Sequence, residues 1–439
     1  MTPPRQRWRA AAWRAHDHLR NWAWSHAHGL RRWRAGSWRG AVPARVFHVT
    51  TSFDLGGTQT QIKHLCTATT GRYEHHAAEM FPELNYLFRQ GVAVAPARYV
   101  TGGPLKRLIG RLIVNRNRRG FHLVQIAKLV RDFRIERPGV VVGWGHEMCV
   151  TTFVAAAIAR VPRIVFCIRT VNPAFGWVEP TFAALLLKAF RRMTPLVNKT
   201  VVNSTFLRDD HGRWVGMDLG EIAVCANGIA TQTLPAERRQ EARTRVRAQY
   251  GIAADAVVIT NVGRFYPEKG QLSLVKANGL LLQRPLAKPV VWILCGDGPT
   301  LPGVQAAATD QGMSNMIFTG RTAAVQDILA ASDIFVMPSD FEGMPNALME
   351  AMAATLPCVS TTRSGARDVA RDGIDALYYE PGDAGALARH LEGLIVDPAT
   401  ARALAASAAA RVAEFSVPRF VGTFEAILDE VTSTPGRDT

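Results

Sequence analysis

The sequence lacks the features that would mark a membrane-spanning or disulfide-bonded protein. No stretch of about 18 residues is apolar and uncharged enough to cross a bilayer, and the best candidate, Cys149 to Ile168, is interrupted by Arg160, Pro162 and Arg163. Six cysteines stand singly, with no Cys-x-x-Cys pair, which favours reduced thiols in the cytoplasm. Asp-x-Asp is absent, as is any His/Cys cluster with zinc-like spacing. The sequence therefore predicts no metal and no cofactor.

Acidic residues are nearly missing from two short segments that carry most of the net charge of +16. Residues 1–44 hold nine Arg against Asp17, and residues 101–120 hold six cations and no acid, so the other 375 residues carry only +2. Residues 1–44 also contain six of the ten Trp. This basic Arg/Trp-rich extension has no apolar core like that of a signal peptide. A disordered tail, a start codon assigned too early and a membrane-interfacial anchor remain open.

The second basic segment has the pattern of an amphipathic helix. Apolar residues recur at helical spacing (Leu105, Leu108, Ile109, Leu112, Ile113), and the cations lie among them. An ordinary surface helix would show the same spacing. Because Arg and Trp are favoured at lipid headgroups, we expect a peripheral protein on an anionic membrane, at the inner face of the cytoplasmic membrane. No nucleic-acid motif is recognised, so no nucleic-acid partner is expected.

Short β-branched runs alternate with amphipathic stretches, which predicts an α/β fold with parallel sheets. A first series of strands begins at Val46–Thr50 and a second at Val257–Asn261. We therefore expect two Rossmann-like domains facing each other across a cleft. The predicted boundaries are 1–44 for the extension, 45–232 for an acceptor domain, 233–414 for a donor domain, and 415–439 for a C-terminal helix that crosses back to the first domain.

Ligands of open parallel sheets bind outside the carboxyl ends of the strands, and five polar segments stand at such positions. In chain order they are Gly56-Gly57, Gly263 to Gly270, Gly296 to Pro299, Phe318 to Arg321 and Asp340 to Met352. The second places Arg264 and Lys269 between glycines, a pattern that suits a pyrophosphate because the backbone can approach closely. Taken singly, Gly56-Gly57 is as often a structural turn as a ligand loop, and Gly296 to Pro299 and Phe318 to Arg321 are more often structural turns than ligand contacts.

The fifth segment is the most informative. Pro345 suits the first turn of a helix, where its missing N–H costs nothing, and free amides at that N-terminus favour an anion. Glu342 lies in the loop entering this helix, and Glu350 lies about a turn further in. Two carboxylates would repel a bare phosphate, so the ligand should also offer hydroxyls. A sugar nucleotide supplies both.

With Glu342 and Glu350 as a Glu-x7-Glu motif, and with these loops in order, the sequence resembles the retaining glycosyltransferases of family 4, which have the GT-B fold. The likeness runs from about Arg45 to Val431 and is strongest from Val257 to Asp383. It implies transfer of a sugar from a nucleotide-sugar donor with retention of configuration, where the donor phosphate itself takes the acceptor proton. A UDP-sugar is the first expectation and GDP-mannose the second. The implied acceptor is a glycan or lipid-linked glycan in cell-surface polysaccharide or glycolipid biosynthesis.

The resemblance also assigns roles in the second domain. Arg264 and Lys269 would hold the donor diphosphate in place of a metal ion. Glu350 would bind the ribose hydroxyls, and Glu342 would bind hydroxyls of the transferred sugar. The loop beside Glu342 would help through its backbone; it consists of Gly343, Met344, Pro345 and Asn346.

Further roles are implied for the other strand ends. Gly56 and Gly57 would let the first-domain loop approach the donor phosphate, while Asp297 and Arg321 mark loops near the nucleobase. His146 follows a strand where the family often places a catalytic-site histidine. The local Gly-Trp-Gly-His departs from the commoner His-x-His pattern, so a structural histidine is the alternative.

Two other functional classes stay open. A GT-B sugar-nucleotide epimerase would share the two-domain cleft, although we would not expect it to carry Glu-x7-Glu with the Gly263–Gly270 loop. A non-catalytic carbohydrate-binding GT-B protein would have no need for both glutamates, Arg264 and Lys269.

Overall fold

The computed structural model describes residues 45–51, 56–68, 71–79, 121–176, 178–230 and 235–433. The basic extension 1–44 and the amphipathic pattern of Leu105–Ile113 lie outside these ranges. The described residues form two compact units: those between 45 and 167, 186–200 and 425–433 make up the first, and those between 168 and 185 and between 201 and 424 make up the second. The domain boundaries expected from the sequence stay predictions.

The first sheet has six strands in the order β2-β1-β3-β4-β5-β6. Their bounds are β1 Arg45–Thr50, β2 Glu74–Glu79, β3 Val140–Trp144, β4 Ile164–Ile168, β5 Lys199–Val202 and β6 Ile222–Val224. The pairs β1–β2, β1–β3 and β3–β4 are parallel. Every residue of β3 and β4 is buried, as expected for strands covered by helices on both faces.

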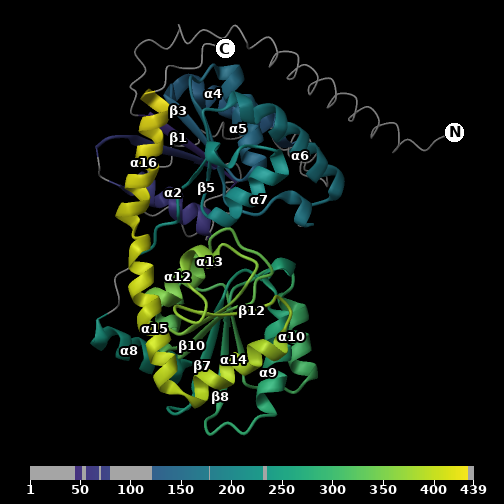
Figure 1. Ribbon diagram of the computed structural model, residues 1–439, viewed down its shortest axis with the longest axis vertical. Coiled ribbons are helices and arrows are strands. Elements are labelled where there is room, and N and C mark those ends of the chain that lie inside the picture. The colour runs from purple at the N-terminus through teal and green to yellow at the C-terminus, as the bar shows by residue number, and fades with distance from the viewer. Residues whose placement is uncertain are drawn as a thin grey trace, which may run out of the picture. The chain divides into compact units, whose positions relative to one another are not determined.

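Five α-helices accompany this sheet in the described residues (Figure 1). They are α2 Gly57–Thr67, α4 Phe121–Glu136, α5 His146–Ala159, α6 Pro180–Met193 and α7 Thr205–Val215. Helix α4 packs beside α5, and α5 lies close on β3. Glycine is required at Gly143 of β3, because a Cβ there would lie 2.7 Å from the Cα of Cys149. This close approach fixes the start of α5 against the strand end.

The second sheet also has six strands, in the order β12-β11-β10-β7-β8-β9. They are β7 Val257–Val262, β8 Val290–Cys295, β9 Met316–Gly320, β10 Ile334–Met337, β11 Cys358–Thr361 and β12 Leu377–Tyr379, and all their pairs are parallel. Strand order reverses between β7 and β10, as in a dinucleotide-binding fold. The expected α/β architecture with two Rossmann-like sheets is confirmed.

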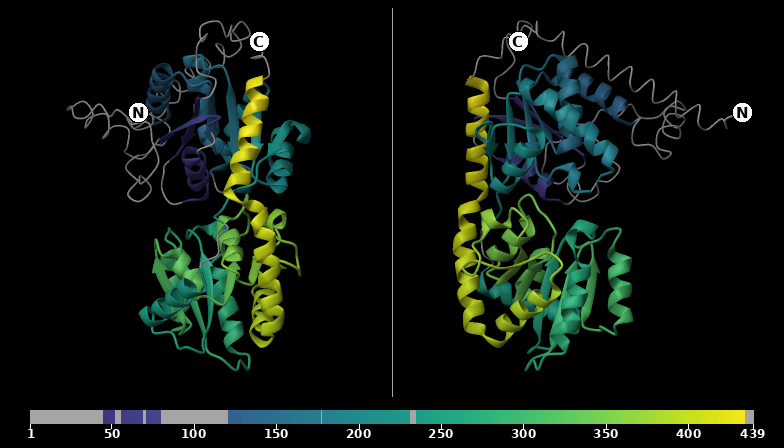
Figure 2. Two further views of the ribbon diagram at one scale, coloured as in Figure 1. Left: turned by 90° about the vertical axis from the view of Figure 1, so that its left-hand side faces the viewer. Right: turned by 45° about the vertical axis from the view of Figure 1, so that its right-hand side comes forward.

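Helices cover both faces of the second sheet, and α15 packs against α12 and α14 (Figures 1 and 2). These helices are α8 Ala236–Gln249, α9 Leu272–Leu282, α10 Leu301–Asp310, α11 Val325–Ala331, α12 Asn346–Ala353, α13 Ala366–Val369, α14 Ala384–Val396 and α15 Pro398–Val412, and α16 Val417–Ser433 follows them. In the described part of the chain, no helix is both long and apolar enough to cross a membrane.

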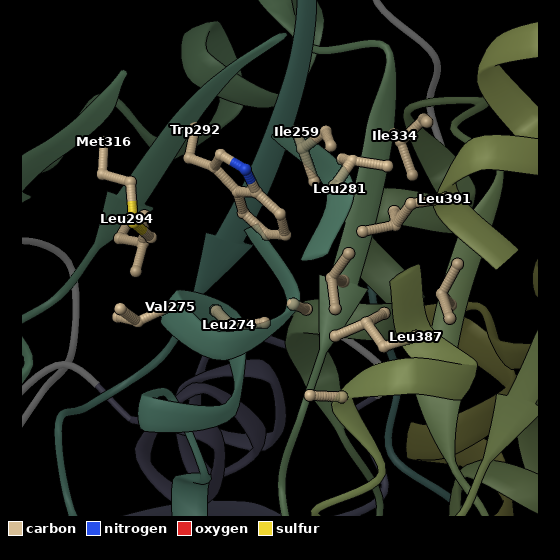
Figure 3. Packing of buried hydrophobic residues seen from close by; sticks show 14 of the residues in the cluster. Ile259, Leu274, Val275, Leu281, Trp292, Leu294, Met316, Ile334, Leu387 and Leu391 are labelled. Carbon is tan, nitrogen blue, oxygen red and sulfur yellow. The ribbon is translucent and has the colours of Figure 1, made fainter. Parts of the chain in front are cut away.

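The core of the second unit surrounds Trp292 of β8, which has no exposed surface. Figure 3 shows its indole among aliphatic side chains that include Ile259, Leu274 and Leu281. The indole Nε1 donates a 2.9 Å hydrogen bond to Oδ1 of the buried Asn278. The polar atom of this large side chain is therefore satisfied, and the sheet has a rigid support beneath the loops at its carboxyl edge.

The second half of α16, from Glu425 onward, belongs to the first unit. Arg163 donates from Nε and Nη2 to the carbonyls of Val431 and Thr432, both at 3.0 Å, and so satisfies the last turn of the helix. The Tyr73 hydroxyl donates to Asp429 at 2.8 Å. The C-terminal end of α16 is thus held within the first unit.

Candidate functional site

Polar loops gather where strand order reverses in the second sheet, between β7 and β10. The loop after β7 runs from Gly263 to Gly270, and the loop after β10 leads from Pro338 to the start of α12. In open α/β sheets, this reversal point opens a crevice at the carboxyl ends of the strands. The two most informative sequence motifs therefore lie at neighbouring strand ends.

The loop after β7 is held in shape by backbone contacts. The amide of Phe265 donates to the Asp297 carbonyl at 2.9 Å, and Gln271 Nε2 donates to the Arg264 carbonyl at 2.9 Å. The Phe265 ring is fully buried, whereas Arg264 is exposed and lies with its guanidinium 4.8 Å from the centre of the Tyr266 ring. A buried neighbour thus anchors a loop that presents Arg264 outward.

Lys269 forms an ion pair with Glu342, which joins the two loops. The side chains are only 18% and 19% exposed. Glu342 Oε1 also accepts a 3.0 Å hydrogen bond from Ser339 Oγ, and the amide of Asp340 donates to the Glu268 carbonyl at 2.9 Å. A cation and a hydroxyl-binding carboxylate are therefore held side by side at the reversal point.

The turn after β8 supports the loop after β7 from its other side. Gly296 and Gly298 have φ of +141° and +155°, and a Cβ on them would lie 1.9 Å and 2.2 Å from the carbonyl oxygens of Gly263 and Phe265. Only glycine fits at both positions. The exposed Asp297 between them accepts a 2.7 Å bond from the Gly298 amide.

Arg321 lies near the same turn. It directly follows β9, and the Gly320 carbonyl accepts a 2.9 Å hydrogen bond from the Gly296 amide. The Arg321 side chain is exposed. The structure thus brings the expected nucleobase-side residues, Asp297 and Arg321, to adjoining strand ends.

The loop before α12 is tightly enclosed. Gly343, Met344 and Pro345 are buried, and α12 begins at Asn346, so Pro345 immediately precedes the first helical residue. A Cβ on Gly343 would lie 2.4 Å from the Arg169 carbonyl oxygen. Within the described residues, the amides of Gly343, Met344 and Asn346 donate to no acceptor. Free donors at a helix N-terminus are suited to anionic or hydroxyl oxygens.

Glu350 lies one turn into α12, and its carboxylate accepts no hydrogen bond from the described residues. The side chain is partly buried, and desolvation raises its pKa from 4.5 to about 7. A ligand that donated hydroxyl hydrogens to this carboxylate would stabilise its ionised form and lower that pKa. The ribose of a nucleotide offers such a pair of hydroxyls.

The remaining predicted residues lie in the first unit, at the point where its own strand order reverses, between β1 and β3. Gly56 directly precedes α2 and Gly57 is its first residue. His146 is the first residue of α5, and its ring is 3% exposed with its centroid 5.5 Å from that of Phe190. The catalytic role expected for this buried ring stays a prediction.

Two residues of the second unit that contact this site were not assigned a role from the sequence. Ser339 bonds to Glu342, and Asn227 donates to Asn346 at 2.7 Å. The sequence signal for Ser339 is its position two residues after the end of β10. For Asn227 the signal is the run Val-Cys-Ala-Asn-Gly-Ile from Val224 to Ile229, one of the recognisable segments of the first domain in the resemblance to family 4.

The described residues contain no group of three or more His, Cys, Asp or Glu arranged to hold a metal ion. The positive charge offered at the reversal point of the second sheet comes from Arg264 and Lys269.

Two family models match the chain. Residues 55–233 match the model described as Glycosyltransferase Family 4, and residues 256–397 match the model described as Glycosyl transferases group 1. The two matches follow one another along the chain, one on each sheet. The chain belongs to glycosyltransferase family 4, and its paired sheets are those of the GT-B fold.

Curated relatives include the lipopolysaccharide core biosynthesis glycosyltransferase LpsE of Rhizobium meliloti, 35% identical over 187 residues that make up 42% of this chain and 51% of that protein. The UDP-Gal:alpha-D-GlcNAc-diphosphoundecaprenol alpha-1,3-galactosyltransferase of Escherichia coli is 26% identical over 243 residues, 52% of this chain and 59% of that protein. The chain thus spans about half the length of the curated relatives it matches.

Among solved structures, Anabaena Alr3699/HepE in complex with UDP-glucose has a TM-score of 0.69 at 19% identity, over 88% of this chain and 99% of that one. Sucrose-phosphate synthase from Thermosynechococcus elongatus also has a TM-score of 0.69, at 17% identity, over 89% of this chain and 100% of that one. At such low identity these likenesses concern the fold.

Proposed function

We propose that the protein transfers a sugar from a nucleotide-sugar donor to a glycan or lipid-linked acceptor, with retention of configuration and without a metal ion. The ion pair of Lys269 with Glu342, placed where strand order reverses in the second sheet, carries this proposal. It puts a diphosphate-binding cation beside a carboxylate that accepts hydroxyl hydrogens. Arg264 adds a second cation from the same loop.

The donor is proposed to be a UDP-sugar, with GDP-mannose second. Support comes from Anabaena HepE, which has the same fold and was solved with UDP-glucose. In this chain Glu350 would receive the ribose hydroxyls, Arg264 and Lys269 the diphosphate, and Glu342 the transferred sugar. The free amides of the loop before α12 would meet developing negative charge on the leaving phosphate.

The acceptor is proposed to lie at the inner face of the cytoplasmic membrane, in cell-surface polysaccharide or glycolipid biosynthesis. The relatives named for lipopolysaccharide core biosynthesis and for a diphosphoundecaprenol acceptor support this class. The basic segments 1–44 and 101–120 supply charge for anionic lipids. Binding to the membrane is then peripheral and reversible.

A thermal-shift screen against UDP-, GDP- and ADP-sugars tests the donor. A ligand at 100 times its Kd stabilises the folded state by about 2.7 kcal/mol, so the true donor should raise the unfolding temperature of the wild-type protein. Lys269→Ala should lose that shift. Stabilisation by none of the three classes, or an equal shift in Lys269→Ala, would refute the donor site.

A further inference from the structure

Asn227 lies at the centre of a buried hydrogen-bond network within the second unit. It follows β6 and is 4% exposed. Its Nδ2 donates to Asn346 Oδ1 at 2.7 Å and to the Met344 carbonyl at 3.2 Å. Its backbone amide lies 3.1 Å from the Met344 sulfur. Asn227 therefore makes three polar contacts with the segment that leads into α12, two with Met344 and one with Asn346.

The orientation of the Asn227 amide is fixed by the chemistry of its neighbours. Arg169 is 7% exposed and donates from Nη1 to Asn227 Oδ1 at 2.8 Å, and a guanidinium can only donate. The Met344 carbonyl can only accept. Oδ1 must therefore face Arg169, and Nδ2 must face the loop. An aspartate at position 227 could still pair with Arg169, but its second carboxylate oxygen would repel the Met344 carbonyl.

We propose that Asn227 is a positioning residue for the donor: it holds the loop from Gly343 to Asn346 in the conformation that presents its free amides and sets Glu342 relative to Glu350. This inference rests on the proposed function for the identity of the ligand. The network itself stands on contacts within one unit and involves none of the residues to which the family resemblance assigns the donor diphosphate.

Hydrogen exchange tests the structural half of the proposal without any ligand. Amides of peptides covering residues 340–352 should exchange at least about tenfold faster in Asn227→Ala than in the wild type, because the loop loses its anchor. The matched control is Asn278→Ala, which removes a buried asparagine from a different network of the same unit. Unchanged exchange in Asn227→Ala, or equal acceleration in the control, would overturn the proposal.

Kinetics test the functional half, with UDP-glucose and GDP-mannose as donors. A purely structural role would reduce the fraction of folded enzyme and leave the KM for the donor unchanged. We expect that KM to rise about tenfold in Asn227→Ala and at least as much in Asn227→Asp, and to stay within twofold of wild type in Asn278→Ala. An unchanged donor KM in both Asn227 variants would overturn the proposal.

A double-mutant cycle locates the path of the effect. The cycle compares Asn227→Ala, Asn346→Ala and the protein that carries both changes. If Asn227 acts through Asn346, the double variant should raise the donor KM no further than the larger of the two single changes. Fully additive effects would show that Asn227 acts elsewhere. The wild-type protein could transfer no sugar while Asn227→Ala still accelerated exchange in the loop. This result would refute the proposed function and leave the anchoring role of Asn227 standing.

Discussion

Under the proposed function, Lys269 and Glu342 would serve both donor binding and charge stabilisation. Each side chain is about four-fifths buried, so removal of either partner leaves the other charge poorly solvated. A leaving diphosphate would draw the ammonium toward its developing charge, while hydroxyls of the sugar would compensate the carboxylate. On this proposal, each member of the pair would exchange its present partner for a group of the donor as the reaction proceeds.

Lys269→Ala and Glu342→Ala should each lower kcat/KM about 100- to 1,000-fold, the usual cost of losing one preorganised electrostatic contact. Arg284→Ala is the matched control, because it breaks an ion pair with Glu392 whose side chains are similarly buried, at 28% and 31% exposed. Steady-state kinetics with circular dichroism checks both. Near-normal rates in both Arg264→Ala and Lys269→Ala would disprove the assignment of this loop to the donor.

Glu350 should make donor binding depend on pH. Burial raises the pKa of the folded-state carboxyl from its ordinary value of 4.5 to about 7, so between these pH values the folded protein keeps a proton that the unfolded chain has released. Folding is therefore penalised progressively as pH rises from about 4.5 to about 7. Because donor hydroxyls favour the ionised carboxylate, donor affinity should instead increase over the upper part of this range.

The affinity for UDP-glucose should accordingly increase about tenfold from about pH 6 to about pH 8 if binding requires the ionised carboxylate. An intact nucleotide-sugar is the right probe, since a terminal phosphate would itself titrate near pH 6. Calorimetric titration checks this, and Glu350→Gln should bind weakly with a flat profile. The same slope in Glu350→Gln would assign the pH dependence to another group.

Among the loops, Gly270 ends the turn that carries Lys269 and lies against Pro338, which directly follows β10. Its φ is +65°, and a Cβ would lie 2.2 Å from the Pro338 carbonyl oxygen. Gly373 has a similar φ of +70° with nothing within 4 Å of its would-be Cβ. Substitution of Gly373 therefore introduces backbone strain alone, whereas substitution of Gly270 introduces the same strain and a steric collision with Pro338.

Gly373→Ala should cost about 1 kcal/mol of unfolding free energy, from strain alone. Gly270→Ala should cost more than that and should also weaken donor binding, because the loop after β7 must move away from Pro338. Urea unfolding and donor titration of both variants measure the difference. Equal losses of stability with unchanged donor affinity in Gly270→Ala would show that this contact does not shape the site.

The sequence predicts the buried central strands better than the edges of the sheets. The predicted strands Val46–Thr50 and Val257–Asn261 lie within the observed β1 and β7, which are interior strands of their sheets. Strands β2 and β12 were not anticipated, and both lie at sheet edges. An edge strand needs no continuous apolar run, so β2, with the sequence Glu-His-His-Ala-Ala-Glu, carries little signal.

The same distinction applies to the site. Strand-end loops follow from the alternation of strand and helix, so the positions of Arg264, Lys269 and Glu342 could be predicted. Their pairing, the raised pKa of Glu350 and the network of Asn227 could not, since they depend on which strands become neighbours and on how deeply each side chain is buried. The local sequence pattern shows neither which strands are neighbours nor how deeply a side chain is buried.

For the chain as a whole, the first expectation concerns metal ions. If Arg264 and Lys269 neutralise the diphosphate, transfer should proceed in excess EDTA at the untreated rate. The assay is donor turnover before and after chelation, with readdition of Mn²⁺ or Mg²⁺. Complete loss in EDTA that either ion restores would contradict the metal-independent mechanism.

The basic segments lead to a second expectation for the whole chain. Each Lys or Arg near an anionic surface contributes about 1 kcal/mol, so the protein should co-sediment with vesicles rich in phosphatidylglycerol and be released by high salt. Deleting residues 1–44 should weaken this binding and leave donor affinity unchanged. Equal binding to neutral phosphatidylcholine vesicles, or none to either kind, would refute electrostatic attachment.

Transfer of a labelled sugar tests the central claim most directly. The wild-type protein is incubated with radiolabelled UDP-sugars or GDP-mannose and a polyprenyl-diphosphate-linked glycan, beside Lys269→Ala and Glu342→Ala, and the anomeric configuration of the product is read by NMR. We predict net transfer with the configuration of the donor retained, and its near-complete loss in both variants. An epimerised nucleotide-sugar, an inverted linkage, or donor binding without any transfer would contradict the account.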